Sequence, residues 1–154
     1  METMPAIDSI LYLMLRSPIH KNMSLTSFDR VVMPSLYLGQ YALWHTPQGI
    51  PTGYASWAYL TDEAAQGYVS QTRKLQPDDW AVGDQLWFIN LIAPFGGVPQ
   101  LVRELQGMFI DGTVAFSLRN KNGKRRISRY GCRNPNILSS SLFDWPPVTS
   151  GVVH

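Results

Sequence analysis

The segment QLWFINLIAPFGG, residues 85–97, limits the possible folds more than any other part of this sequence. Its first nine residues form a near-continuous apolar run, which is typical of a central strand covered on both faces. Glycines and an amphipathic pattern follow, in which Leu101, Leu105 and Met108 recur at helical spacing. A strand, a glycine turn and a helix in this order aim free backbone N–H groups at an anionic ligand. The segment therefore predicts an α/β domain with a candidate anion site at its turn.

Helices and hairpins are predicted on both sides of this segment. A helix over 5–16 should end at Ser17-Pro18, because the residue before a proline is driven out of the helical region. The same pair can begin a new helix, with Ser17 as its N-cap and His20 at its third position. The other expected elements are a helix near 26–33, a hairpin joining 37–45 to 52–60, a helix over 61–71 capped by Thr61, and a hairpin joining 113–119 to 125–131 around Asn122-Gly123. Together they predict an α/β (α+β) fold with a mostly antiparallel central sheet flanked by helices.

Length and composition exclude several classes of protein. A chain of 154 residues, 45% hydrophobic and 16% charged, suits one globular domain, which we place at 1–131, with a Ser-, Pro- and Asn-rich tail at 132–154. The single cysteine, Cys132, excludes a disulfide framework, and the three scattered histidines show no metal-ligand spacing. No apolar run is long enough to span a membrane, and the N-terminus lacks the basic start of a secretory signal. We therefore expect a cytoplasmic protein without a metal.

The positive charge is concentrated in one segment. Six of the 13 basic residues lie in this segment. The rest of the chain holds the other seven together with all 11 acidic residues, so it is net acidic. Such a patch indicates an anionic partner, which can be a phosphate, an acidic protein, an anionic membrane surface or a nucleic acid. Nucleic acid is the weaker interpretation, because the patch is short and the chain outside it is net acidic. The patch comprises Arg119, Lys121, Lys124, Arg125, Arg126 and Arg129, with no acidic residue among them.

The motif RSPIHKN contains a candidate general base. A histidine at a helix N-terminus feels the positive end of the helix dipole, which favours the neutral imidazole, and Lys21 adds to this effect. A neutral imidazole can accept a proton, so His20 is suited to general base catalysis. The alternative interpretation is that Ser17-Pro18 only stops a helix and that His20 is an ordinary surface residue.

Two further features have both a structural and a functional interpretation. Asn90 is a lone amide in an apolar strand, and it must be hydrogen-bonded if its burial is not to cost about 1–3 kcal/mol. It either ties two strands together or belongs to a reaction centre. Likewise, APFGG at 93–97 is either an ordinary connection between a strand and a helix or a turn that binds phosphate.

Five segments, taken in their order and spacing, carry a resemblance to a known family. They are SPIHKN, GQYALW, GYASWAYL, DDWAVGDQLWFINLIAPFGG and the arginine-rich hairpin. Over residues 7–131, and most specifically from Trp80 to Gly96, the chain resembles the RTX toxin-activating lysine acyltransferases, the hemolysin-activating family. The resemblance implies a GNAT-like acyltransferase fold and the transfer of a fatty acyl group from acyl carrier protein to internal lysines of an RTX-type protoxin. It also implies action in the cytoplasm, a homodimer and no tightly bound cofactor.

The resemblance also assigns roles to individual residues. It implies that His20 is the catalytic histidine, that Ser17 is the serine of the same motif, and that Asn90 stands at the position of the catalytic aspartate. Lysine has an ordinary pKa of about 10.4, so the target amine must lose a proton before it attacks the thioester, and His20 is a suitable base. The donor, a phosphopantetheine thioester on the acidic acyl carrier protein, is expected at the glycine turn and the basic hairpin. The residues expected to bind it are Ala93, Phe95, Gly96, Gly97, Arg119, Lys121 and Arg125.

Asn90 departs from the pattern of this family. An amide can hold an imidazole or a lysine in place but cannot compensate its charge, and in a comparable triad the amide lowers turnover by about 10⁴. The residue is then a tolerated natural variation, the mark of a catalytically impaired family member, or a change introduced to trap a complex. An impaired member would act as a binding module for acyl carrier protein or protoxin, and transfer would appear in the Asn90→Asp variant.

Overall fold

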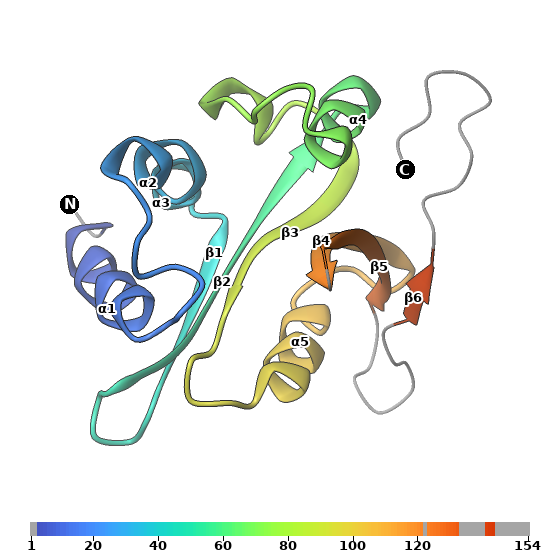
Figure 1. Cartoon of the computed structure of the whole chain (residues 1–154). Coiled ribbons are helices and arrows are strands. Elements are labelled where there is room, and N and C mark those ends of the chain that lie inside the picture. The colour runs from blue at the N-terminus through green and yellow to red at the C-terminus, as the bar shows by residue number, and fades with distance from the viewer. Residues whose placement is uncertain (1–2, 122, 133–140, 144–154) are drawn as a thin grey trace.

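The computed structural model describes residues 3–121, 123–132 and 141–143 (Figure 1). Its helices are α1 (Thr3–Leu15), α2 (Leu25–Val31), α3 (Met33–Leu38), α4 (Asp62–Ser70) and α5 (Val98–Gln106), with the short 3-10 turn η1 (Pro77–Asp79). Its strands are β1 (Tyr41–His45), β2 (Pro51–Leu60), β3 (Gln85–Ile92), β4 (Thr113–Lys121), β5 (Lys124–Cys132) and β6 (Ser141–Phe143).

The strands form one sheet in the order β1-β2-β3-β4-β5-β6. Every neighbouring pair is antiparallel except β3 and β4, which are parallel and are connected through α5. In Figure 1, α1, α2 and α3 lie on one side of the long β2–β3 pair, and α5 lies on the other side, near β4 and β5. The predicted α+β fold, with a mostly antiparallel sheet flanked by helices, is therefore confirmed.

Two irregularities of β3 shape the middle of the sheet. The parallel pairing with β4 covers three positions and ends at Phe88 opposite Ser117, so the following residues of the two strands are not paired with each other. On its other edge, β3 pairs Phe88 with Trp57 and Asn90 with Ser56, which leaves Ile89 as a bulge. A bulge bends a strand and redirects its side chains, and bulges are common beside active sites.

The bulge changes which face of the sheet each β3 side chain meets. Before it, Leu86 and Phe88 pack with α5, whereas Trp87 packs with α4. After it, Ile92 packs with α1 and α3 although it has the same parity as Phe88. Side chains of a regular strand alternate strictly, so the inserted residue accounts for this change of face. As a result Asn90 meets the N-terminal helices instead of α5.

Most of the elements expected from the sequence are present, although the first strand of the expected 37–45 hairpin begins only at Tyr41, because 37–38 belong to α3. Thr61 caps α4 through a hydrogen bond from the Ala64 N–H to its Oγ1 at 3.1 Å. Gly123 has a φ of 77°, as the expected turn between β4 and β5 requires, while Asn122 lies outside the described residues. In the tail, 133–140 and 144–154 also lie outside them.

Three expectations about local structure are wrong. No helix begins at Ser17: residues 18–22 form turns, closed by hydrogen bonds from the N–H groups of His20 and Lys21 to the Ser17 carbonyl. Met108 is exposed because α5 stops at Gln106, so Met108 does not continue the buried face of the helix formed by Leu101 and Leu105. Cys132 does not belong to an irregular tail but is the buried last residue of β5.

Candidate functional site

His20 lies in the turn after α1, half-buried, with its ring fixed by the neighbouring serine. The Nδ1 atom of His20 is 2.7 Å from the Oγ of Ser17, which is buried. Burial lowers the pKa of His20 below its ordinary value of 6.5, because desolvation disfavours the charged imidazolium. The direction agrees with the expectation, but the cause is burial and not a helix dipole, since no helix begins there.

The hydrogen bond to Ser17 determines what the other ring nitrogen of His20 can do. When Nδ1 carries the proton and donates it to Ser17 Oγ, Nε2 presents a free lone pair. Within the described part of the chain, Nε2 has no protein hydrogen-bond partner. The pair can therefore present a neutral imidazole that accepts a proton at Nε2.

Asn90 is buried and its amide is engaged on two sides. Its Nδ2 donates to the Val31 carbonyl oxygen and to Ser56 Oγ, each at 2.8 Å. The Val31 carbonyl oxygen can only accept a hydrogen bond, so the NH2 group of Asn90 and not its oxygen must face it, which fixes the orientation of the amide. Beside this group, burial raises the pKa of Tyr54 to about 12, so its phenol is neutral and donates or accepts hydrogen bonds only. The amide of Asn90 therefore ties β3 to β2 and to the end of α2, while its place in a reaction centre stays a prediction.

His20 and Asn90 line the same cavity, which has a volume of about 580 Å³. The cavity lies where β3 and β4 cease to pair, so it receives residues from the turn after α1 on one face of the sheet and from α5 on the other. Backbone N–H and C=O groups on the facing edges of the two strands are not used by the β3–β4 ladder here, and such groups can bind an extended polar ligand. The lining comprises Ile19, His20, Phe88, Ile89, Asn90, Leu91, Val98, Pro99, Val102, Ser117, Leu118, Arg119, Asn120 and Tyr130.

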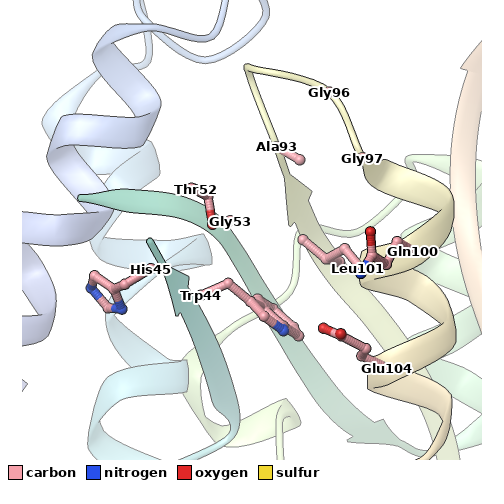
Figure 2. A pocket seen from close by; sticks show the side chains of 10 residues that line it. All are labelled: Trp44, His45, Thr52, Gly53, Ala93, Gly96, Gly97, Gln100, Leu101 and Glu104. Atoms are coloured by element: carbon pink, nitrogen blue, oxygen red, sulfur yellow. The ribbon is translucent and has the colours of Figure 1, made fainter. Parts of the chain in front are cut away.

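The glycine turn lies on a second cavity, of about 280 Å³, on the other flank of α5 (Figure 2). Gly97 caps α5 in a left-handed conformation, with a φ of 86°, and Gly96 has a φ of 99°, so both positions favour glycine. Phe95 is exposed and its ring contacts that of Tyr12 in α1 at a centroid distance of 6.4 Å. The lining comprises Trp44, His45, Thr52, Gly53, Ala93, Gly96, Gly97, Gln100, Leu101 and Glu104. The structure therefore separates Ala93, Gly96 and Gly97 from His20.

The basic residues predicted to bind the donor do not lie at one site. Arg119 is exposed and lines the cavity of His20. Arg125 is half-buried, and its Nη1 donates to the Val69 carbonyl oxygen in the last turn of α4 at 2.7 Å. Lys121 is the last residue of β4, and its side chain lies outside the described part of the structure.

Sequence reasoning missed a pair of hydroxyl groups in the larger cavity. Ser117 Oγ lies 2.9 Å from the phenolic oxygen of Tyr130, and both residues are buried. The signal was present, because Ser117 is a polar residue between apolar ones in TVAFSLR, as Asn90 is in its own strand. This pair adds hydroxyl donors to a cavity that already holds an imidazole and an amide.

The pKa of His20 leads to a prediction about pH. Because burial lowers the folded-state pKa, the unfolded chain binds this proton more readily, so stability contributed by the neutral ring is present above pH 6.5 and is lost as the pH falls below it. We expect the His20 ring to titrate below pH 6.5 in an NMR titration, with the resonance assigned by its absence in His20→Gln. A midpoint at or above 6.5 would contradict the desolvated site.

The contact of Arg125 leads to a prediction about stability. The substitution Arg125→Met keeps an apolar side chain of similar length. It removes the charged donor at the C-terminal end of α4, where a cation is favourable. We expect a loss of about 1 kcal/mol in the free energy of unfolding by urea. The matched control is Arg129→Met on the exposed side of β5, which should stay within about 0.5 kcal/mol. Equal effects of the two substitutions would argue against this role of Arg125.

The mixed sheet, with its parallel β3–β4 pair opening around a histidine, is consistent with the α+β fold of an acyltransferase. The model of the RTX toxin acyltransferase family, HlyC, matches residues 1–131. The chain is 34% identical over 137 residues to the protein-lysine myristoyltransferase RtxC of Kingella kingae, covering 87% of this chain and 80% of that protein. It is 35% identical over 139 residues to the protein-lysine myristoyltransferase HlyC of Escherichia coli, covering 89% and 79%. It is 38% identical over 103 residues to the RTX-II toxin-activating lysine-acyltransferase ApxIIC of Actinobacillus pleuropneumoniae, covering 67% and 64%.

This chain therefore belongs to the RTX toxin acyltransferase family. Its relatives are named as lysine acyltransferases, which supports an acyltransferase activity. Within the described residues, no helix is long and apolar enough to cross a membrane, and no group of three or more histidines, cysteines or carboxylates could hold a metal ion.

Proposed function

We propose that this chain transfers a fatty acyl group from acyl carrier protein to the ε-amine of lysines in an RTX protoxin. The observation that carries the proposal is the half-buried His20, held by Ser17 at a cavity between two strands that cease to pair. Membership of the family supports the reaction class, and the names of the relatives support a lysine as the acceptor.

His20 acts as the general base in this reaction. Its Nε2 first takes a proton from the target ammonium and releases it to solvent, and then takes a second proton from the amine nitrogen as that nitrogen forms a bond to the thioester carbon. The tetrahedral intermediate collapses with cleavage of the C–S bond, and the pantetheine sulfur leaves as a thiolate that takes up the proton. Ser17 accepts from Nδ1–H throughout, so the imidazolium keeps the orientation of the neutral ring.

The phosphopantetheine arm lies in the opening between β3 and β4. Its amides can pair with the strand edges beyond Phe88, and an N–H there or the Ser117–Tyr130 hydroxyl pair can donate to the thioester oxyanion. Arg119 at the same cavity attracts the phosphate, and the basic residues of the β4–β5 hairpin attract the acidic carrier protein. The donor is therefore acyl carrier protein in this proposal.

Asn90 supports a second candidate function. It is neutral where the family resemblance leads us to expect an aspartate, so it positions its neighbours and compensates no charge. A protein with an impaired site would bind acyl carrier protein or protoxin without transferring the acyl group. This binding module is the alternative that the following experiment separates from the enzyme.

The experiment incubates the chain with acylated carrier protein and the RTX protein encoded beside its gene, and measures the intact mass of the RTX protein. The proposal expects a mass increase of one fatty acyl group per modified lysine, mapped by peptide analysis. An arm with acyl coenzyme A tests whether the carrier protein is required. Saturable binding of the carrier protein without any mass increase would support the binding module and overturn the enzyme.

Two further parts of the proposal follow from the family resemblance alone. We place the reaction in the cytoplasm, and we propose a homodimer. Light scattering of the purified chain at several concentrations tests the second part, and a mass of a single chain at all of them would overturn it.

A further inference from the structure

The second cavity, beside α5, is not used by the proposed reaction. It lies between the β1–β2 hairpin and α5, and Figure 2 shows the Glu104 side chain extending from α5 toward the indole of Trp44 on β1. Gly53 lets the Leu101 side chain of α5 approach β2, because a Cβ at position 53 would lie 2.6 Å from Leu101 Cδ1. The His45 ring points away from the cavity in Figure 2, and its Nε2 lies 3.2 Å from Ser9 Oγ in α1.

The charge of this cavity is uncompensated. Glu104 is exposed and forms no hydrogen bond or ion pair within the part of the chain that the structure describes. Trp44 is half-buried and contributes an aromatic surface beside that carboxylate. A carboxylate and an indole at one cavity form a binding site for a cation, through an ion pair and a cation–π contact.

The size and charge of the cavity decide which cation fits. Its volume of about 280 Å³ is below the usual range of about 300–1,000 Å³ for sites of drug-sized ligands, so it suits a single side chain. The carboxylate of Glu104 repels a phosphate, although the cavity includes the glycine turn at which we expected one. The site is therefore suited to a cationic side chain and unsuited to the phosphate of the acyl donor.

We propose that this cavity binds a lysine or arginine side chain of the protein substrate, a few residues from the lysine that is acylated. The proposal rests on the proposed function and adds a determinant of substrate recognition. The two cavities lie on the two flanks of α5, and a helix is about 10–12 Å across. Extended peptide rises about 3.3 Å per residue, so the bound cation lies about three or four residues from the acceptor lysine.

The test compares Glu104→Gln with Glu63→Gln, a matched substitution of an exposed glutamate in α4. We expect Glu104→Gln to raise KM for the RTX substrate about two- to fivefold at low salt, with kcat and KM for the acyl donor unchanged. The increase should disappear at high salt, because exposed ion pairs are screened. Glu63→Gln should leave all three constants unchanged.

A binding measurement keeps the inference testable if no transfer is observed. Nα-acetyl-lysine methylamide is titrated into the full chain while the Trp44 indole N–H is followed by NMR, with the norleucine analogue as the uncharged probe. We expect a saturable shift with the lysine probe only, which is lost in Glu104→Gln and retained in Glu63→Gln. An equal response to both probes, or no response to either, would overturn the inference and leave the proposed function standing.

Discussion

Replacing His20 by alanine is expected to lower kcat/KM for acyl transfer by about 10²- to 10⁴-fold, the usual contribution of a general base. The variant loses the imidazole that accepts the proton in the proposed reaction, and the target lysine then depends on water to remove its proton. Because His20 is only half-buried and belongs to a turn, the fold should be retained, which circular dichroism checks. The rate is measured from the intact mass of the RTX substrate over time.

Two variants show whether the loss comes from the imidazole itself. Lys21→Ala changes an exposed residue of the same turn and should retain the wild-type rate. Ser17→Ala removes the partner of Nδ1, so it should reduce the rate about tenfold and change the pH profile while keeping substrate affinity. Acyl transfer by His20→Ala at the wild-type rate would exclude His20 as the base.

The two hairpins and the cap of α4 could be predicted because they depend on local patterns. The alternating and apolar runs, the turn at Gly123 and the cap at Thr61 each act within a few residues of sequence, and all appear as expected. The amphipathic period of α5 predicted Leu101 and Leu105 as core residues for the same reason.

The geometry of the site depends on contacts that are distant in sequence. The bulge at Ile89 follows from the register between β2 and β3, and it directs Asn90 to a carbonyl 59 residues away. The cavity of His20 exists because β3 and β4 pair at only three positions, which no local pattern reveals. In the sequence Arg125 looks like the other cations of its segment. In the fold its guanidinium donates to the Val69 carbonyl oxygen at the end of α4, because tertiary packing brings Val69 close to it.

Replacing Asn90 by aspartate is expected to destabilise the protein by about 3 kcal/mol at pH 7. Both hydrogen bonds of the Asn90 side chain are donated by Nδ2, and a carboxylate has no proton to donate to the Val31 carbonyl oxygen 2.8 Å away. The substitution also buries a negative charge that has no cation among its described contacts. Leaving the Val31 carbonyl oxygen without its donor costs about 1–3 kcal/mol, and burying an unpaired charge adds to this cost. Urea unfolding of the two proteins under the same conditions measures the difference.

The deficit of Asn90→Asp should depend on pH in a defined direction. The protonated carboxyl can donate to Val31 and is the form favoured by burial, so its folded-state pKa is raised above the ordinary value of about 3.9. The deficit relative to wild type is therefore smallest near pH 4 and grows as the pH rises through the folded-state pKa. Asn120→Asp, at an exposed position on the same cavity, should change stability by less than about 0.5 kcal/mol at either pH.

The same variant decides between the two candidate functions. If the amide is part of a working site, Asn90→Asp transfers no faster than wild type, because the hydrogen bond that holds Val31 is lost. An Asn90→Asp protein that is as stable as wild type and gains transfer would instead show that the amide disabled a site built for a carboxylate. In that case the wild-type chain would be the binding module, and the hydrogen bond to Val31 would not be required by the fold.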